Sequence, residues 1–91
     1  MTASVSLPPR LDLTQARPMA ESILAHAGQD LTIDAGGVEH LGALSAQVLL
    51  AALSDWQRAG HSLTIAPRSD AFDDALAAMG LADRLAMGTQ Q

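Results

Sequence analysis

Side chains that could carry acid–base or metal chemistry are spread along the chain. Histidine is the usual proton shuttle and metal ligand near neutral pH, but His26, His40 and His61 fall in three separate segments, and none has a second histidine four residues away. The chain contains no cysteine, which excludes disulfides, thiolate metal sites and cysteine nucleophiles. We therefore expect no metal site, no cofactor and no enzymatic activity.

Asp34 is the carboxylate best placed to meet a ligand. It ends a predicted strand, at the edge where open α/β sheets bind their ligands, so a nucleotide or a small anion is one alternative. The other is that Asp34 caps the following turn, because an aspartate side chain accepts a bond from the backbone two residues on. Gly36 and Gly37 lack the further glycines and the lysine of a phosphate-binding loop. The sequence therefore contains no recognisable catalytic motif.

Composition and charge exclude several classes of partner. The 91 residues are 48% hydrophobic and carry ten Asp and Glu against five Arg and no Lys, a formal net charge of −5. Such a chain cannot neutralise a run of phosphates, so we expect no nucleic-acid partner. Its longest apolar stretch, 48–53, is far shorter than the ~20 residues of a membrane span. We expect one domain over residues 1–91, with a core over about 5–87, that is cytoplasmic and does not insert into a membrane.

A repeated pattern of helix, glycine and strand must position these residues. A helix is expected over 43–59, ended by Gly60, and the strand segments 29–34 and 61–66 resemble each other in sequence. This order is typical of βαβ units, whose strands run parallel. The pattern predicts an α/β fold: a central mixed β-sheet of about four to five strands with parallel βαβ units, and about four helices.

The flanking segments complete this fold. Residues 3–13 alternate like one or two strands at the sheet edge, interrupted by two prolines. A helix is then expected from an N-cap at Thr14 to Gly28, and Pro67 is expected to end the last strand. Ser69 is the expected N-cap of a final helix that ends at Gly80.

The segment 31–50 resembles the STAS family of sulfate-transporter and anti-sigma-factor-antagonist domains. In that family a strand ending in Asp leads through a short turn to an Asp-Ser-Ser-Gly or Asp-Thr-Gly-Gly signature and a Leu-rich helix that ends in Gly before another strand. The positions that match this frame are Asp34, Gly37, Val38, Leu41, Val48, Leu49, Leu50, Gly60 and Leu63-Thr64-Ile65. The chain is most similar to the short STAS proteins of alphaproteobacterial chemotaxis gene clusters, which also lack a phosphorylatable signature.

The signature itself departs from the family pattern. Gly42-Ala43-Leu44-Ser45 stands where Asp-Ser-Ser-Gly is expected, so Leu44 occupies the phosphoacceptor position and Gly42 that of its supporting aspartate. Ser45 is a candidate phosphoacceptor one residue later, since a phosphate near a helix N-terminus is stabilised by the macrodipole. The alternative is that Ser45 is a residue of the N-terminal helix turn or a small packing residue.

The resemblance implies a non-enzymatic protein-interaction module of bacterial signal transduction, in chemotaxis, with a degenerate phosphorylation signature. Its partner would be a cytosolic signalling protein: a histidine kinase, a receptor or an anti-sigma-like protein. Two alternatives are an accessory STAS subunit of an ABC-type lipid transporter and an anti-anti-sigma-type regulator phosphorylated at Ser45. A homodimer is left open. The expected partner-binding residues are Gly37, Val38, Glu39, His40, Gly42, Ala43, Leu44 and Gln47.

Overall fold

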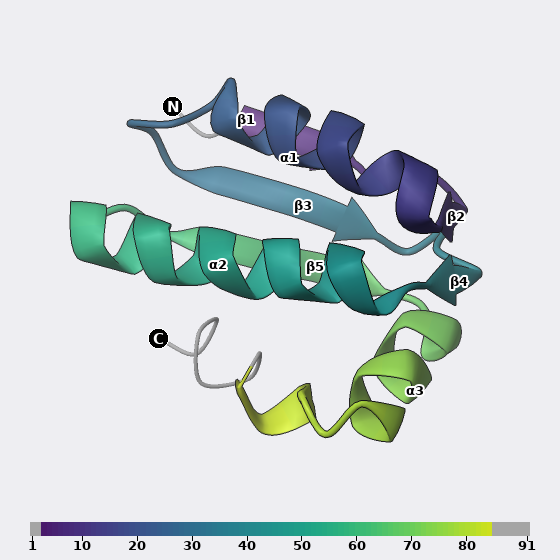
Figure 1. Cartoon of the computed structure of the whole chain (residues 1–91). Coiled ribbons are helices and arrows are strands. Elements are labelled where there is room, and N and C mark those ends of the chain that lie inside the picture. Colours follow the sequence, from purple (N-terminus) through teal and green to yellow (C-terminus); the bar gives the residue numbers. More distant parts are fainter. Residues whose placement is uncertain (1–2, 85–91) are drawn as a thin grey trace.

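A three-stranded parallel sheet forms the centre of the structure (Figure 1). The computed structural model describes residues 3–84 of the chain. Its main sheet has the order β1-β3-β5, from β1 (Ala3–Ser6), β3 (Leu31–Ala35) and β5 (Leu63–Arg68). Each connection between neighbouring parallel strands passes through a helix, so these are the βαβ units that the sequence predicts.

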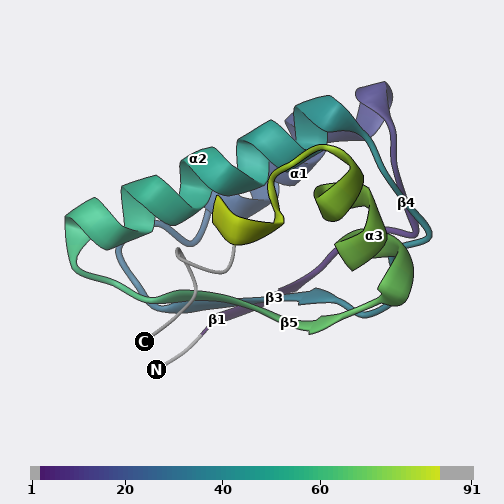
Figure 2. The same ribbon diagram turned by 90° about the horizontal axis from the view of Figure 1, so that it is seen from below.

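Within residues 3–84, helices cover only one face of this sheet. Figure 2 shows three helices on the same side of the strands: α1 (Ala16–Leu24), α2 (Ala43–Ala59) and α3 (Asp70–Ala78). Successive strand residues point to opposite faces, so Leu31, Ile33 and Ala35 are buried under the helices. The other face of the sheet carries small and mostly polar side chains. Those that are exposed there include Ser4, Ser6 and Thr64.

A second, smaller sheet pairs β2 (Arg10–Leu11) with β4 (His40–Leu41). The α/β class and the parallel units are confirmed, but the five described strands divide between two sheets instead of forming one mixed sheet, and their pairings are all parallel. Proline explains the division, because Pro8 and Pro9 have no amide hydrogen for a ladder. The last bond between the first strand segment and β3 is therefore that from Leu7 N–H to the Asp34 carbonyl, at 2.9 Å.

The limits of the second and third helices follow the predicted caps. Helix α2 spans the predicted range, and Gly60 ends it in the left-handed conformation, with φ 82°, which glycine adopts without a steric penalty. Ser69 caps α3, since its Oγ accepts the Phe72 N–H at 3.0 Å.

Strand β5, however, continues through Pro67 to Arg68. In the described sheet β5 is an edge strand, where a missing amide hydrogen is tolerated.

The predicted N-cap at Thr14 is wrong. Asp12 caps a short 3-10 helix, η1 (Leu13–Gln15), and its Oδ1 accepts bonds from both the amide and the hydroxyl of Thr14, at 3.1 and 2.7 Å. Helix α1 follows η1 and ends at Leu24, before the expected limit at Gly28. The competing 3-10 turn forms because an aspartate carboxylate satisfies the free amides of the first turn.

The core lies between the sheet and the helices. Its members include Phe72 of α3 and Leu11 of β2, both fully buried, and the buried ring of Trp56. Trp56 Nε1 donates to the Gln29 carbonyl at 2.8 Å, so the ring's polar atom has a partner as burial requires. Residues 85–87 of the expected core lie outside the described part. Within residues 3–84, no helix is both long and apolar enough to cross a membrane.

Candidate functional site

Most of the predicted partner-binding residues lie on the surface around the start of α2. Gly37 and Glu39 are exposed in the segment between β3 and β4, and His40 is exposed at the start of β4. Ala43, Leu44 and Gln47 are exposed in the first turns of α2. With Leu13 of η1, described below, these residues are called the docking surface. They share one end of the molecule because β4 leads directly into α2.

Val38 and Gly42 are the exceptions: Gly42 is half-buried, and the Val38 side chain is only 2% exposed. The Val38 carbonyl accepts the Ser69 hydroxyl at 2.6 Å, and its own N–H donates to the Ala35 carbonyl at 3.3 Å. The same Ser69 oxygen caps α3. Val38 therefore anchors the segment between β3 and β4 to the core and to the start of α3. Its side chain is not placed to contact a partner.

Backbone bonds hold the rest of the loop against the segment that precedes η1. The amides of Glu39 and His40 both donate to the Pro9 carbonyl, at 2.7 and 3.1 Å, and the Gly42 amide donates to the Leu11 carbonyl at 2.9 Å. A segment with its amides satisfied in this way is positioned before any partner arrives, so binding orders few additional residues.

Gly42 approaches the backbone too closely for any side chain. Its conformation is extended, with φ −81° and ψ 162°, which any residue can adopt. A Cβ at this position would lie 2.9 Å from the Leu11 carbonyl oxygen. The aspartate of the STAS signature, which this position would carry, therefore does not fit here unless the backbone near β2 moves.

Leu13 is a residue of the docking surface that the sequence analysis missed. It is 75% exposed, and Leu44 is 48% exposed. Asp12, next to Leu13, lies beside Gly42 at the start of α2, so the two leucines occupy the same end of the molecule. The alternation of Leu11 and Leu13 suggested a strand in which both leucines share a face. The Asp12–Thr14 pair was the signal for a capped turn instead, and that turn directs Leu13 outward.

Ser45, the candidate phosphoacceptor, faces the interior. It is 1% exposed, and its Oγ has no hydrogen-bond partner among the described residues. A buried hydroxyl without a partner lowers stability, and a phosphoryl donor cannot reach it in this conformation. Phosphorylation would require the first turn of α2 to open.

Asp34 caps its own turn, the second of the two alternatives. Its Oδ1 accepts the Gly36 N–H at 2.8 Å. Asp30, at the other end of β3, accepts the Ser62 N–H at 3.0 Å and lies 3.7 Å from His61 Nδ1. The Ser62 amide is the main reason that the pKa of Asp30 is below its ordinary value. Residues 3–84 contain no group of three or more His, Cys, Asp or Glu placed to hold a metal ion.

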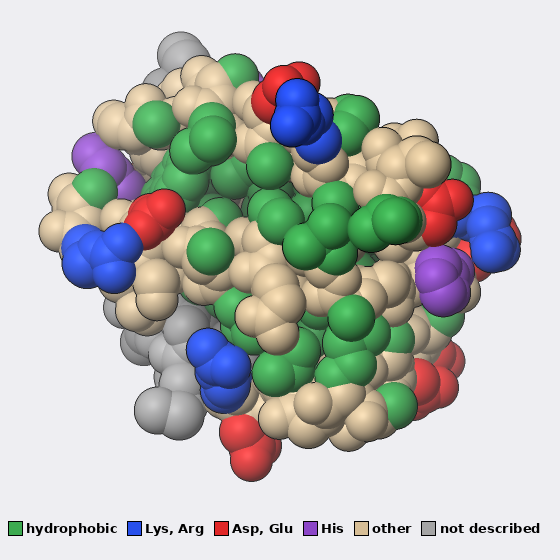
Figure 3. All heavy atoms as spheres, in the orientation of Figure 1, with side chains coloured by type: hydrophobic (Ala, Val, Ile, Leu, Met, Phe, Trp, Pro, Cys, Tyr) green, Lys and Arg blue, Asp and Glu red, His purple; other side chains and the backbone are tan. Residues whose placement is uncertain are grey.

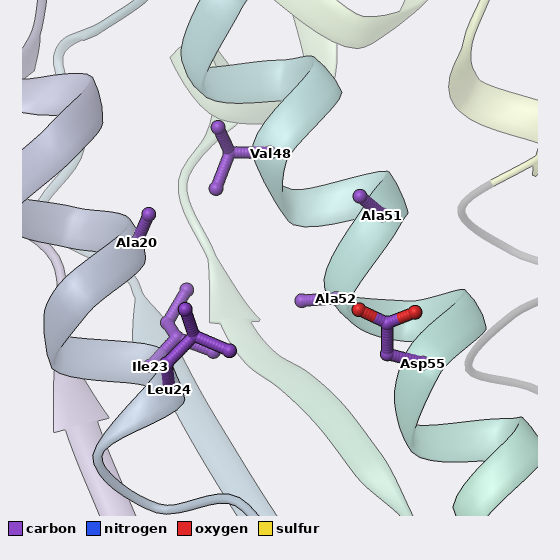
Figure 4. Close-up of a pocket in the computed structure, with 7 residues that line it drawn as sticks. All are labelled: Ala20, Ile23, Leu24, Val48, Ala51, Ala52 and Asp55. Carbon is purple, nitrogen blue, oxygen red and sulfur yellow. The ribbon is translucent and has the colours of Figure 1, made fainter.

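An apolar groove separates α1 from α2, and sequence analysis did not anticipate it. Figure 3 views this side of the molecule and shows hydrophobic side chains gathered across its middle. The groove has a volume of about 190 Å³. Figure 4 shows Leu24 of α1 and Val48 and Ala52 of α2 directed toward it from opposite sides, with Asp55 at one end.

Comparison with protein-family models adds independent information. The model described as "Mlab, STAS domain" matches residues 2–88, almost the whole chain. The chain belongs to the STAS family. Searches of curated proteins and of solved structures found no match. The STAS prediction and the fold it implies are thus confirmed, and membership indicates a regulatory or interaction module. The similarity to chemotaxis-cluster proteins stays a prediction.

Proposed function

We propose that this STAS domain is a protein-interaction module of bacterial signal transduction, without enzymatic activity, that docks a cytosolic partner through the docking surface. The observation that carries the proposal is the exposure of Leu13 and Leu44 at the same end of the molecule as a preformed loop. Leucines exposed together and flanked by polar groups are typical of protein-binding surfaces. Chemotaxis as the process rests on the sequence resemblance alone.

The proposed mechanism is occupancy of the surface. A partner covers Leu13 and Leu44, and each leucine contributes on the order of 1 to 2 kcal/mol when its exposed part leaves water. Glu39, His40 and Gln47 form a polar rim that selects the partner by its hydrogen-bonding groups. Because the loop is already bonded in place, little ordering opposes the association.

Ser45 does not gate this surface in the proposed mechanism. The side chain is buried at the position where a switch would need an accessible hydroxyl. The position of the family phosphoacceptor carries Leu44, which cannot be phosphorylated. Docking is therefore constitutive, and it is regulated by the amounts of the two proteins.

The test is affinity capture from native extract of the source cells with wild-type and Leu44→Glu baits, and with mass spectrometry of the bait and its partners. Thr64→Glu is the control, because it adds the same charge at an exposed position of β5, away from the docking surface. Wild type and control should retain a histidine kinase, a receptor or an anti-sigma-like protein that Leu44→Glu loses. Circular dichroism establishes that each variant is folded.

Two other results would replace the proposal by one of its alternatives. Recovery of a transporter ATPase would favour an accessory subunit of an ABC-type lipid transporter. A bait whose mass has increased by one phosphate at Ser45 would favour an anti-anti-sigma-type regulator. A folded Leu44→Glu variant that captures every wild-type partner in equal yield would contradict docking at this surface.

A further inference from the structure

The docking surface and the groove between α1 and α2 form one continuous apolar path. Among the described residues, the large hydrophobic side chains that are exposed are Leu13, Leu24 and Leu44. Leu13 and Leu44 belong to the docking surface, and Leu24 lines the groove. Leu44 and Val48 lie one turn apart on the same face of α2, and Val48 is a half-buried residue of the groove. The groove therefore begins where the docking surface ends.

The path continues along both helices beyond the hollow of Figure 4. A second hollow of about 280 Å³ shares Leu24 and Asp55 with the first and reaches Ala59 at the end of α2. The two hollows together are called the long groove. Positions 44, 48, 51, 55 and 59 follow one another at intervals of three or four residues, so they share one face of α2. At a rise of about 1.5 Å per residue, this face is about 22 Å long.

Backbone chemistry decides what can lie in the long groove. The residues that line both hollows come from α1, α2 and the segments just after them, and none belongs to a strand. An extended segment would therefore leave its N–H and C=O groups unpaired against apolar walls, which is costly. A helix bonds its own backbone groups and presents only side chains, so a helix is the element that fits.

A small apolar ligand is a poor fit for the same groove. Leu24, on its wall, is 60% exposed, whereas a small-molecule site encloses most of its ligand. Alanines supply much of the remaining lining: Ala20, Ala27, Ala51, Ala52 and Ala59. Small side chains allow another helix to approach closely, because the distance between packed helices depends on the side chains at the contact. The long groove therefore suits the large apolar side chains of an approaching helix.

We infer that the long groove holds an amphipathic helix of the same partner that covers Leu13 and Leu44. This inference rests on the proposed function, since it extends the docking surface along α2. A helix as long as the groove has about 15 residues. Its apolar side chains recur at every third or fourth position and face the groove, and its polar side chains face outward. One binding event then covers all three exposed leucines.

Helix dipoles set the direction of the bound helix. Figure 1 shows α1 and α2 running the same way, and both begin at the end of the molecule that carries β2 and β4. The last turn of α1 contains no basic residue, and Arg58 in the last turn of α2 is paired with Asp55. A helix antiparallel to both therefore places the positive end of its dipole beside their negative ends. Its N-terminus is expected near Ala59 and its C-terminus near Leu44.

The test is photocrosslinking of the full chain in its source cells. One residue at a time, Leu24, Leu44, Ala59 or Thr64, is replaced by the photoreactive p-benzoylphenylalanine, and mass spectrometry identifies the linked protein and the linked residue. Thr64 is the control, because it is exposed on the uncovered face of the sheet. Positions 24, 44 and 59 should link to one protein, within one segment of about 15 residues. Position 59 should link nearer the N-terminus of that segment than position 44.

The outcomes separate this inference from the proposed function. A chain that links to no protein at position 44 or at position 24 contradicts both. A link at position 44 without links at positions 24 and 59 keeps the docking surface and overturns the bound helix. Links from position 24 to a second copy of this chain, to a lipid or to a different protein also overturn it.

A synthetic peptide of the linked segment then tests the helix and its site directly. Its circular dichroism should show a gain of helix when the purified full chain is added, and fluorescence anisotropy measures its dissociation constant. Ala51→Glu places a charge in the groove at an exposed position and should weaken binding about tenfold or more, because docking would bury an unpaired charge. Thr64→Glu should bind as the wild type does. Equal dissociation constants for the two folded variants, or binding without a gain of helix, would overturn the inference.

Discussion

Gly42 offers the sharpest test of how the start of α2 is held against β2. In Gly42→Ala the new Cβ would lie 2.9 Å from the Leu11 carbonyl oxygen, and a forced contact of this kind costs about 1 to 3 kcal/mol. Replacing glycine also restricts the unfolded chain, which returns about 0.4 to 1 kcal/mol at a compatible conformation. Subtracting the second range from the first leaves a net loss of up to about 2.6 kcal/mol, centred near about 1.3 kcal/mol, in the free energy of unfolding.

Gly37→Ala, in the segment just before β4, is the matched comparison. A Cβ on Gly37 meets nothing within 4 Å, and its φ is not among the positive ones, so only the unfolded-state effect remains and stability should rise by about 0.4 to 1 kcal/mol. Urea denaturation measures both variants, and in thermal unfolding each kcal/mol corresponds to about 4 to 8 °C in Tm for a domain of this size. Equal stabilities for the two variants would refute the argument that the Leu11 carbonyl excludes a side chain at position 42.

Two further predictions concern a buried hydroxyl and a capping carboxylate. Ser45→Ala removes a buried group without a partner, so denaturant unfolding should show unchanged stability or a gain of about 1 kcal/mol; a clear loss would mean that the hydroxyl is bonded. The Thr14 hydroxyl is the main reason that the pKa of Asp12 is lowered. The contribution of the ionised Asp12 to the stability of the fold is therefore present above the ordinary aspartate pKa and is lost as pH falls through the lowered pKa. In Asp12→Asn, Tm should therefore fall less on acidification than it does in the wild type. An equal fall of Tm in both proteins would contradict this prediction.

The strongest local signals predicted their elements well. Leucine and alanine spacing with a terminal glycine located α2 and Gly60, and the serine three residues before Phe72 located the cap of α3. These helix limits and caps depend on residues within one or two turns of each other, so they can be predicted from the local sequence alone. The STAS resemblance came from the same kind of pattern, a strand, a turn and a Leu-rich helix in fixed order.

The docking surface could be predicted only in part. The exposed loop and Leu44 follow from the position of the degenerate signature, but Val38 and Ser45 are apolar or small residues whose side depends on how the loop turns. Their burial results from the bond between Val38 and Ser69 and from the packing of α2 on the sheet. Leu13 was missed because one aspartate, Asp12, changed the direction of the chain.

Sequence by itself determined the α/β class, the parallel βαβ units, the family and the absence of a phosphorylatable residue at position 44, because periodicity, caps and residue identity are local properties. Tertiary structure alone decided that Gly42 faces the Leu11 carbonyl and that the strand after Pro8 and Pro9 pairs with β4. It also decided that α1 and α2 leave an apolar groove between them. Each of these results depends on contacts between segments distant in the chain, whose distances and directions no local pattern specifies.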